Sequence, residues 1–112
     1  SRGLGDVYKR QHVETMIMAT REMLHEAVEM FIARDMEAAK RVIREDDLID
    51  ECFNKVKYDL IDSLKREVKD ADECIDVLML AKYLEKIGDH AVNIGEWEIF
   101  QETGNISDMR LL

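Results

Sequence analysis

The sequence predicts an all-α protein that folds as one antiparallel three-helix bundle. The 112 residues include no proline and only five glycines, the residues that most often break helices. In addition, apolar residues recur at three- and four-residue steps over three long segments, which places them on one face of each helix. A chain of this length has room for one hydrophobic core and little room for a second.

The first predicted helix begins at His12 and ends near Ala33. The preceding residues 1–11 contain two of the five glycines, lack an initiating Met and show no apolar period, so we interpret them as a non-native or truncated leader. The bundle is then expected to occupy residues 12–106, with residues 107–112 as a C-terminal tail. The apolar stripe of this first helix comprises Val13, Met16, Ile17, Thr20, Leu24, Ala27 and Phe31.

A second helix is predicted to follow Asp35, whose carboxylate suits an N-cap because it can accept hydrogen bonds from backbone N–H groups that lack a helical partner. We expect one long helix that breaks up in the polar stretch 69–72. Its apolar stripe comprises Ala38, Val42, Ile49, Phe53, Val56, Leu60 and Leu64.

The third helix is expected to start at Asp70 or Asp72 and to end at Gly104, a residue suited to the left-handed position after a helix. Gly88 and Gly95 lie inside it, where each glycine costs about 1 kcal/mol relative to alanine. We interpret both as points of close helix packing. The stripe comprises Val77, Leu80, Ala81, Leu84, Ile87, Gly88, Ala91, Gly95 and Ile99.

Composition excludes several classes of protein. A formal net charge of -9 argues against a nucleic-acid binder, which must neutralise phosphates with clustered Lys and Arg. No apolar stretch approaches the roughly 20 residues that cross a bilayer, so the sequence indicates a cytoplasmic protein. Cys52 and Cys74 lie on separate predicted helices without metal-type or redox spacing, and we expect two reduced, partly buried thiols.

Two pairs of carboxylates are the main candidates for chemistry. Asp46 and Asp50 are four residues apart on the second helix, as are Glu85 and Asp89 on the third, so each pair occupies one helix face. Like charges at this spacing destabilise a helix by a few tenths of a kcal/mol unless a cation is near. Because 25 residues are acidic, such pairs also arise by chance, and a solvated acidic face is the alternative.

Antiparallel packing affects how the two pairs meet. A turn near residues 69 and 70 places Asp50 level with Asp89, and Asp46 level with Asn93. Both pairs lie on corresponding flanks of their stripes, a geometry that permits convergence at the bundle surface and equally permits divergence.

Oxygen ligands of this kind suit Mg, Mn, Ca or iron. Asn93 fits a ligand or an interhelical hydrogen-bonding group equally well, and Glu96 and His90 are weaker candidate ligands.

Two stretches of the sequence resemble the PhoU family. The segment from Ala81 to Trp97 reads AKYLEKIGDHAVNIGEW, close to the hallmark of that family, which usually has Arg where Lys86 stands. The upstream stretch RDMEAAKRVIREDDLID, at residues 34–50, is also similar. The resemblance covers roughly residues 12 to 104 and implies a three-helix repeat, of which family members normally have two. This chain has one, which resembles the C-terminal repeat more than the first.

The resemblance also implies a site and a function. In the family, an E(D)xxxD pattern supplies ligands for multinuclear metal clusters, which gives Asp46, Asp50, Glu85 and Asp89 that role, with iron as the first expected metal and Mn, Mg or Zn as others. It implies a non-enzymatic, cytoplasmic regulator that damps phosphate uptake and the phosphate-starvation response. The implied partners are the ATPase subunit of the phosphate ABC transporter and a membrane sensor histidine kinase, through which alone it would reach the membrane. Because one repeat is present, a homodimer is expected to imitate the full molecule.

Two other functions compete with this one. Glu22 and His25 form a Glu-x-x-His motif, as in ferritin-like di-iron oxidases, but such a site needs two of these motifs and two further glutamates in a four-helix core. A plain helical interaction scaffold, with acidic pairs that serve solubility, is the third interpretation. The sequence shows no catalytic triad, phosphate-binding glycine loop or HExxH motif, so no enzyme is predicted.

Overall fold

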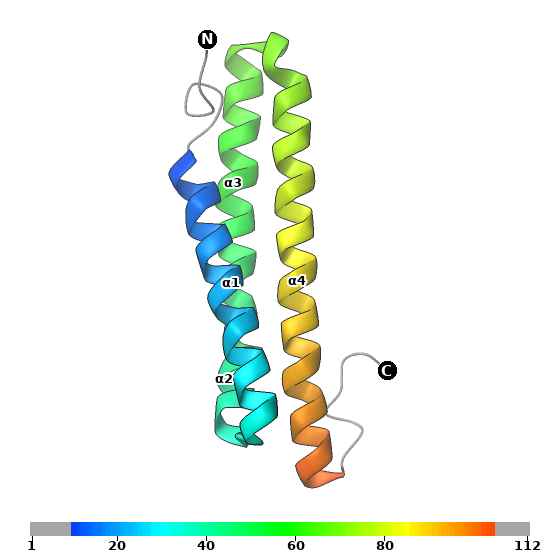
Figure 1. The fold of residues 1–112 in the computed structure, drawn as a ribbon. Coiled ribbons are helices and arrows are strands. Elements are labelled where there is room, and N and C mark those ends of the chain that lie inside the picture. Colours follow the sequence, from blue (N-terminus) through cyan, green and yellow to red (C-terminus); the bar gives the residue numbers. More distant parts are fainter. Residues whose placement is uncertain (1–9, 105–112) are drawn as a thin grey trace.

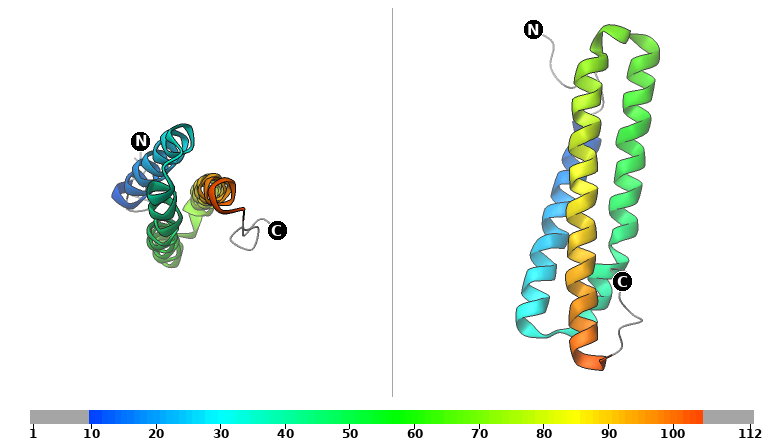
Figure 2. Two further views of the ribbon diagram at one scale, coloured as in Figure 1. Left: turned by 90° about the horizontal axis from the view of Figure 1, so that it is seen from below. Right: turned by 90° about the vertical axis from the view of Figure 1, so that its right-hand side faces the viewer.

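The computed structural model describes residues 10–104, and these form the predicted three-armed helical bundle (Figure 1). The first and third arms run in the same direction and the middle arm runs in the opposite one, as the two further views in Figure 2 also show. None of the described residues lies in a β-strand. The elements are α1 (Arg10–Ala33), α2 (Met36–Arg44), α3 (Asp46–Arg66), the 3-10 turn η2 (Val68–Asp70) and α4 (Ala71–Thr103).

The bundle is elongated, with extents of 53 × 23 × 16 Å. Its length reflects the 33 residues of α4, which spans the whole molecule and packs against each of the other α-helices. Within the described part of the chain, no helix combines the length and the apolar character needed to cross a membrane.

The middle arm differs from the single long helix predicted from the sequence, because it is divided at Glu45 into α2 and α3. The Glu45 N–H donates to the carbonyl oxygens of both Arg41 (3.0 Å) and Val42 (3.1 Å), and its own carbonyl accepts from Leu48 N–H three residues on (3.0 Å). The two bonds that span three residues, from Glu45 N–H to Val42 and from Leu48 N–H to Glu45, interrupt the four-residue pattern of α-helical hydrogen bonds. The short α2 packs chiefly on the C-terminal half of α4, and the break lets it take a different direction from α3.

The two glycines inside α4 lie at the points where α2 and α3 approach it. A Cβ atom on Gly95 would lie 3.1 Å from the Ala39 carbonyl oxygen and 3.2 Å from Ile43 Cγ1. A Cβ atom on Gly88 would lie 3.5 Å from Ile49 Cγ2, an ordinary contact. Both glycines are buried, which confirms the prediction of close packing, and the approach is closer at Gly95.

The ends of the helices follow the expected capping chemistry. Asp35 precedes α2 in an extended conformation, and its Oδ1 accepts from Ala38 N–H at 3.0 Å, as predicted. Asp70 occupies the predicted N-cap position of α4, but its side chain makes no capping hydrogen bond there. Gly104 has φ of +69° and donates its N–H to the Phe100 carbonyl at 2.7 Å, which confirms the predicted left-handed end.

The buried face of α1 differs in part from the predicted stripe. Ile17, Leu24 and Phe31 are 37–39% exposed, whereas Met23 and Met30 occupy core positions. The apolar arc of α1 is wider than the face it buries, so periodicity alone could not choose which flank turns inward. The buried residues are Val13, Met16, Thr20, Met23, Ala27 and Met30. Leu80, assigned to the stripe of α4, is likewise 40% exposed.

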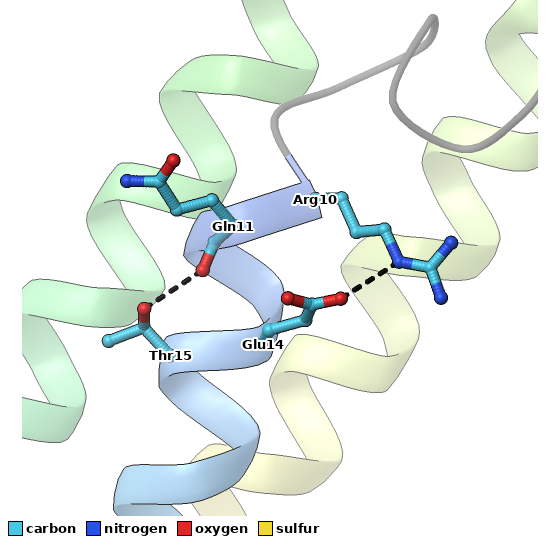
Figure 3. A network of polar contacts seen from close by, with 4 residues as sticks. All are labelled: Arg10, Gln11, Glu14 and Thr15. Atoms are coloured by element: carbon cyan, nitrogen blue, oxygen red, sulfur yellow. Dashed lines mark hydrogen bonds and ion pairs between the residues drawn. The ribbon is translucent and has the colours of Figure 1, made fainter.

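Helix α1 begins two residues earlier than predicted. Figure 3 shows its first turn, in which Arg10 Nε donates to Glu14 Oε1 at 2.9 Å and Thr15 Oγ1 donates to the Gln11 carbonyl at 2.8 Å. These contacts place Arg10 and Gln11 in the first turn of α1. The rest of the predicted leader, residues 1–9, and the predicted tail lie outside the described residues.

Both cysteines are free and buried, as the sequence predicts. Cys52 is 5% exposed and Cys74 is 2% exposed. Burial raises the pKa of the Cys52 thiol, so this thiol is held in its unreactive protonated form.

Candidate metal centre

The predicted carboxylates come together between α3 and α4. Asp46 and Asp50 belong to the first two turns of α3, and Glu85 and Asp89 lie midway along α4. The pKa of Asp50 is raised, first by partial burial and then by repulsion from neighbouring carboxylates. Those neighbours are, in order of effect, Asp46, Glu85, Asp89 and Asp47.

The cluster lies at the surface of the bundle. Asp50 and Asp89 are exposed, whereas Asp46, Glu85 and Asn93 are half-buried. Solvent can therefore reach the two central carboxylates, while the flanking groups are held against the helices. This is the location expected from the flank positions in the sequence.

Two further residues at this cluster were not singled out by the sequence argument. Asp47 also raises the pKa of Asp50. In the sequence, its position directly after Asp46 could have pointed to it. Lys82 Nζ lies 3.2 Å from Glu85 Oε1 and 4.4 Å from the centre of the Phe53 ring, so one cation is present at the rim. Lys82 precedes Glu85 by three residues, a spacing that places the two on one helix face.

The cluster is rich in oxygen donors, but these side chains do not form a complete metal site. Among residues 10–104, no group of three or more His, Cys, Asp or Glu side chains is arranged to hold a metal ion as the side chains stand. Repulsion from the neighbouring carboxylates nevertheless adds to the effect of burial in raising the pKa of Asp50. A cation would relieve that repulsion, so the donor chemistry fits a hard metal ion after side-chain rotation.

The two weaker candidates are placed less favourably. His90 is exposed, and it follows Asp89 by one residue, so its side chain points about 100° away around the helix. Glu96 is 2% exposed and faces the bundle interior, two turns beyond Asp89. Neither the His90 nor the Glu96 side chain is therefore part of the surface cluster.

The Glu-x-x-His motif on α1 faces away from the core. Glu22 lies 3.5 Å from Arg21, and His25 lies 3.4 Å from Glu29, with side chains that are 65–71% exposed. A ferritin-like site is built from inward-facing side chains of a four-helix core. The motif therefore lacks the placement that such a site requires.

A second carboxyl pair links α1 to the break in the middle arm. The pKa of Glu45 is raised to about 7 by burial, by a side-chain hydrogen bond with Glu26 and by repulsion from Glu26, and Arg41 partly offsets this rise. Arg41 Nε lies 3.6 Å from Glu26 Oε1. This pair could not be predicted from the sequence, because spacing along the chain does not show which residues of different helices meet.

Comparisons with known proteins bear on the family. A family model described as the PhoU domain matches residues 13–97. A Burkholderia protein named "Phosphate-specific transport system accessory protein PhoU homolog" is 37% identical over 78 residues, which cover 70% of this chain and 33% of the relative. A relative of the same name from Borreliella burgdorferi is 30% identical, and the one named homolog 1 from Thermotoga maritima is 29% identical. The matched region covers 40% of the length of each. The chain thus spans about a third to two fifths of these relatives. No solved structure gives a significant match.

Proposed function

The chain belongs to the PhoU family, and from this premise we propose that it is a regulator of phosphate transport and phosphate-starvation signalling that acts as a metal-binding helical adaptor. Its relatives are named accessory proteins of the phosphate-specific transport system. The proposal is for a cytoplasmic, non-enzymatic protein. An oxygen-dependent ferroxidase assay should accordingly show no turnover of iron.

The observation that supports metal binding is that carboxylates of α3 and α4 lie near one another, where burial first and then repulsion from Asp46, Glu85 and Asp89 raise the pKa of Asp50. Carboxylates that repel one another in this way bind a multivalent cation with relief of the repulsion. The residues that would hold the cluster are Asp46, Asp50, Glu85 and Asp89, with Asn93 beside them. Iron is the metal we propose first, and Mn, Mg or Zn are the others. Bound ions would supply positive charge that can hold an anion such as phosphate.

The adaptor role rests on charge and exposure. The chain carries a net charge of -9, to which the exposed Asp50 of α3 and Asp89 of α4 contribute at the cluster. An acidic surface of this kind favours association with basic protein surfaces. We propose the ATPase subunit of the phosphate ABC transporter and a membrane sensor histidine kinase as those partners, so that the protein reaches the membrane only through them. Metal occupancy would change the charge that the partners meet.

Metal content tests the first part. The protein is purified without chelator, supplied with Fe or Mn and analysed by mass spectrometry, beside a variant with Asp50→Ala and Asp89→Ala. A control is Asp72→Ala with Asp76→Ala, which also removes two exposed aspartates, both on α4 at the four-residue spacing of Glu85 and Asp89. Metal that is lost only from the first variant supports the site. Equal metal in both variants, or none in the parent after supply, contradicts it.

Partner binding tests the second part. Glu85→Ala with Asp89→Ala should weaken binding to the ATPase subunit while the helical circular dichroism stays unchanged. Unchanged binding would show that the cluster takes no part in partner contact.

A further inference from the structure

A lysine side chain lies between the carboxylate cluster and an aromatic ring. Lys82 belongs to α4, and its ammonium group donates a hydrogen bond to Glu85 Oε1 at 3.2 Å. The same Nζ atom lies 4.4 Å from the centre of the Phe53 ring, which belongs to α3. Helices α3 and α4 pack side by side and run in opposite directions (Figure 1). One cation therefore contacts both helices at the edge of the cluster.

The carboxylate that Lys82 contacts is partly withdrawn from solvent. The Glu85 side chain is 24% exposed, whereas Asp50 and Asp89 are exposed residues. A carboxylate that loses part of its hydration is destabilised in its charged form, and a positive charge nearby offsets that loss. Lys82 supplies this charge from three residues earlier on the same helix face. In metal-free protein, the ammonium group thus occupies one of the predicted metal ligands.

The charge that Lys82 supplies does not reach the centre of the cluster. The charged groups that shift the pKa of Asp50 are all carboxylates, and each of them raises it. They are Asp46, Glu85, Asp89 and Asp47. The Asp50 carboxylate is therefore under net repulsion although Lys82 pairs with Glu85. A multivalent cation that reaches several of these carboxylates at once neutralises more charge than the single ammonium group does.

The pair of Lys82 and Glu85 breaks at little cost. The Lys82 side chain is 61% exposed, so water competes for its charge. Exposed ion pairs contribute little to stability, because the ordering of a long side chain offsets most of the attraction. An ammonium group is also a compact charge on a flexible stem, and it does not grip a carboxylate at two points as a guanidinium does. Glu85 is thus held loosely enough to be released.

Phe53 gives the ammonium group a second partner once Glu85 is released. The Phe53 side chain is 7% exposed and belongs to the hydrophobic core, so its ring is held in place. The face of an aromatic ring attracts a cation that lies within about 6 Å of its centre, and Lys82 Nζ is within that range. Lys82 can therefore give up Glu85 and keep a favourable contact at the rim of the cluster.

We propose that Lys82 is a built-in counter-cation of the cluster, which pairs with Glu85 in metal-free protein and releases Glu85 when a multivalent cation enters. The inference rests on the metal centre proposed above. Lys82 then opposes metal binding, because its bond to Glu85 must break and its positive charge repels the entering ion. The lysine is a positioning residue that sets the affinity of the site, and it is not itself a ligand.

Titration calorimetry of Mn²⁺ into metal-free protein tests this exchange. Lys82→Met keeps an unbranched apolar stem and removes the charge, so it should bind Mn²⁺ about tenfold more tightly than the parent. Lys82→Arg keeps the charge and should bind no more tightly than the parent. A residue with only a structural role would lower the affinity or leave it unchanged when replaced, so the direction of the change separates the two roles.

Lys86→Met is the matched control. It removes the same charge one turn further along α4, from a side chain whose Nζ lies 6.0 Å from the centre of the Tyr83 ring. Because salt screens charges that are not in contact, this variant should bind Mn²⁺ within about threefold of the parent. Mn²⁺ bound equally or more weakly by Lys82→Met, or bound equally tightly by both methionine variants, overturns the role of Lys82 and leaves the metal centre standing.

A double-mutant cycle measures the pair without metal. Lys82→Met, Glu85→Gln and the double variant are unfolded in urea, and the unfolding equilibrium constants should show a coupling of about two- to fivefold. A cycle without coupling overturns the proposal even where Mn²⁺ binds. If the coupling is present and neither the parent nor any variant binds Mn²⁺, the metal centre itself is overturned, together with the release of Glu85 to a metal ion.

Discussion

Replacement of Gly95 by alanine tests whether the close approach of α2 to α4 depends on the missing side chain. The new Cβ would lie 3.1 Å from the Ala39 carbonyl oxygen and 3.2 Å from Ile43 Cγ1, both closer than ordinary contact. The first of these atoms belongs to the backbone of α2, so relief requires a shift of the helix itself. Gly88→Ala is the matched control, because its Cβ would meet Ile49 Cγ2 at 3.5 Å.

The expected magnitude follows from two opposing effects. Alanine is more favourable than glycine inside a helix by about 0.8–1.0 kcal/mol, and both variants gain this amount. Overpacking in a filled interior costs about 1–3 kcal/mol, and only Gly95→Ala bears this cost. Gly88→Ala should therefore be more stable than the parent by up to about 1 kcal/mol. Gly95→Ala should be less stable than Gly88→Ala by about 1–3 kcal/mol.

Urea unfolding followed by circular dichroism at 222 nm measures both variants at constant pH. The thermal midpoints should differ in the same order, by about 4–8 °C for each kcal/mol in a domain of this size. Equal stability of the two variants, within about 0.5 kcal/mol, would refute the packing argument, because it would mean that α2 yields to the new methyl group without cost.

Three further predictions concern titration and burial. The pKa of Asp50 is raised, so the charged form of this side chain destabilises the fold. In metal-free protein at pH 7, Asp50→Asn should therefore increase the free energy of unfolding. A decrease would contradict the repulsion inferred at the cluster. Glu45 has its pKa raised from 4.5 to about 7, so its contribution to stability is present below pH 4.5 and is lost as the pH rises through 7. Unfolding measured across this window should show Glu45→Gln gaining stability relative to the parent as pH rises, and a constant difference would speak against the pair with Glu26. Cys52 and Cys74 are 5% and 2% exposed, so a thiol reagent should label them only at the rate of opening or unfolding, and fast labelling of the native protein would show that α3 or α4 is open there.

The general architecture was accessible from the sequence because it depends on local signals. The Asp35 cap, the left-handed Gly104 and the absence of proline fix where helices start and stop, whatever they later pack against. The spacing of Asp46 to Asp50 and of Glu85 to Asp89 likewise fixes which side chains share a helix face. Whether these pairs form a metal site stays a prediction.

The break at Glu45 was not accessible in the same way. Glutamate is a good helix former, and no glycine or proline interrupts residues 36–66, so local propensity favours one continuous helix. The division of the middle arm into α2 and α3 follows from packing, since α2 packs against α4 where Gly95 leaves room for the Ala39 backbone. That contact joins residues far apart in the chain, and propensity carries no information about it.

By itself the sequence determined the all-helical class, the helix ends, the family and the carboxylate pairs as candidate ligands, because each depends on residues within a few turns of one another. Only the tertiary structure decided which flank of α1 is buried, where the middle arm divides and that Ile17, Leu24 and Phe31 stay exposed. The physical reason is that hydrophobicity drives burial without specifying a partner. Ile17, Leu24 and Phe31 are as apolar as the core methionines, and only the placement of the neighbouring helices separates the two groups.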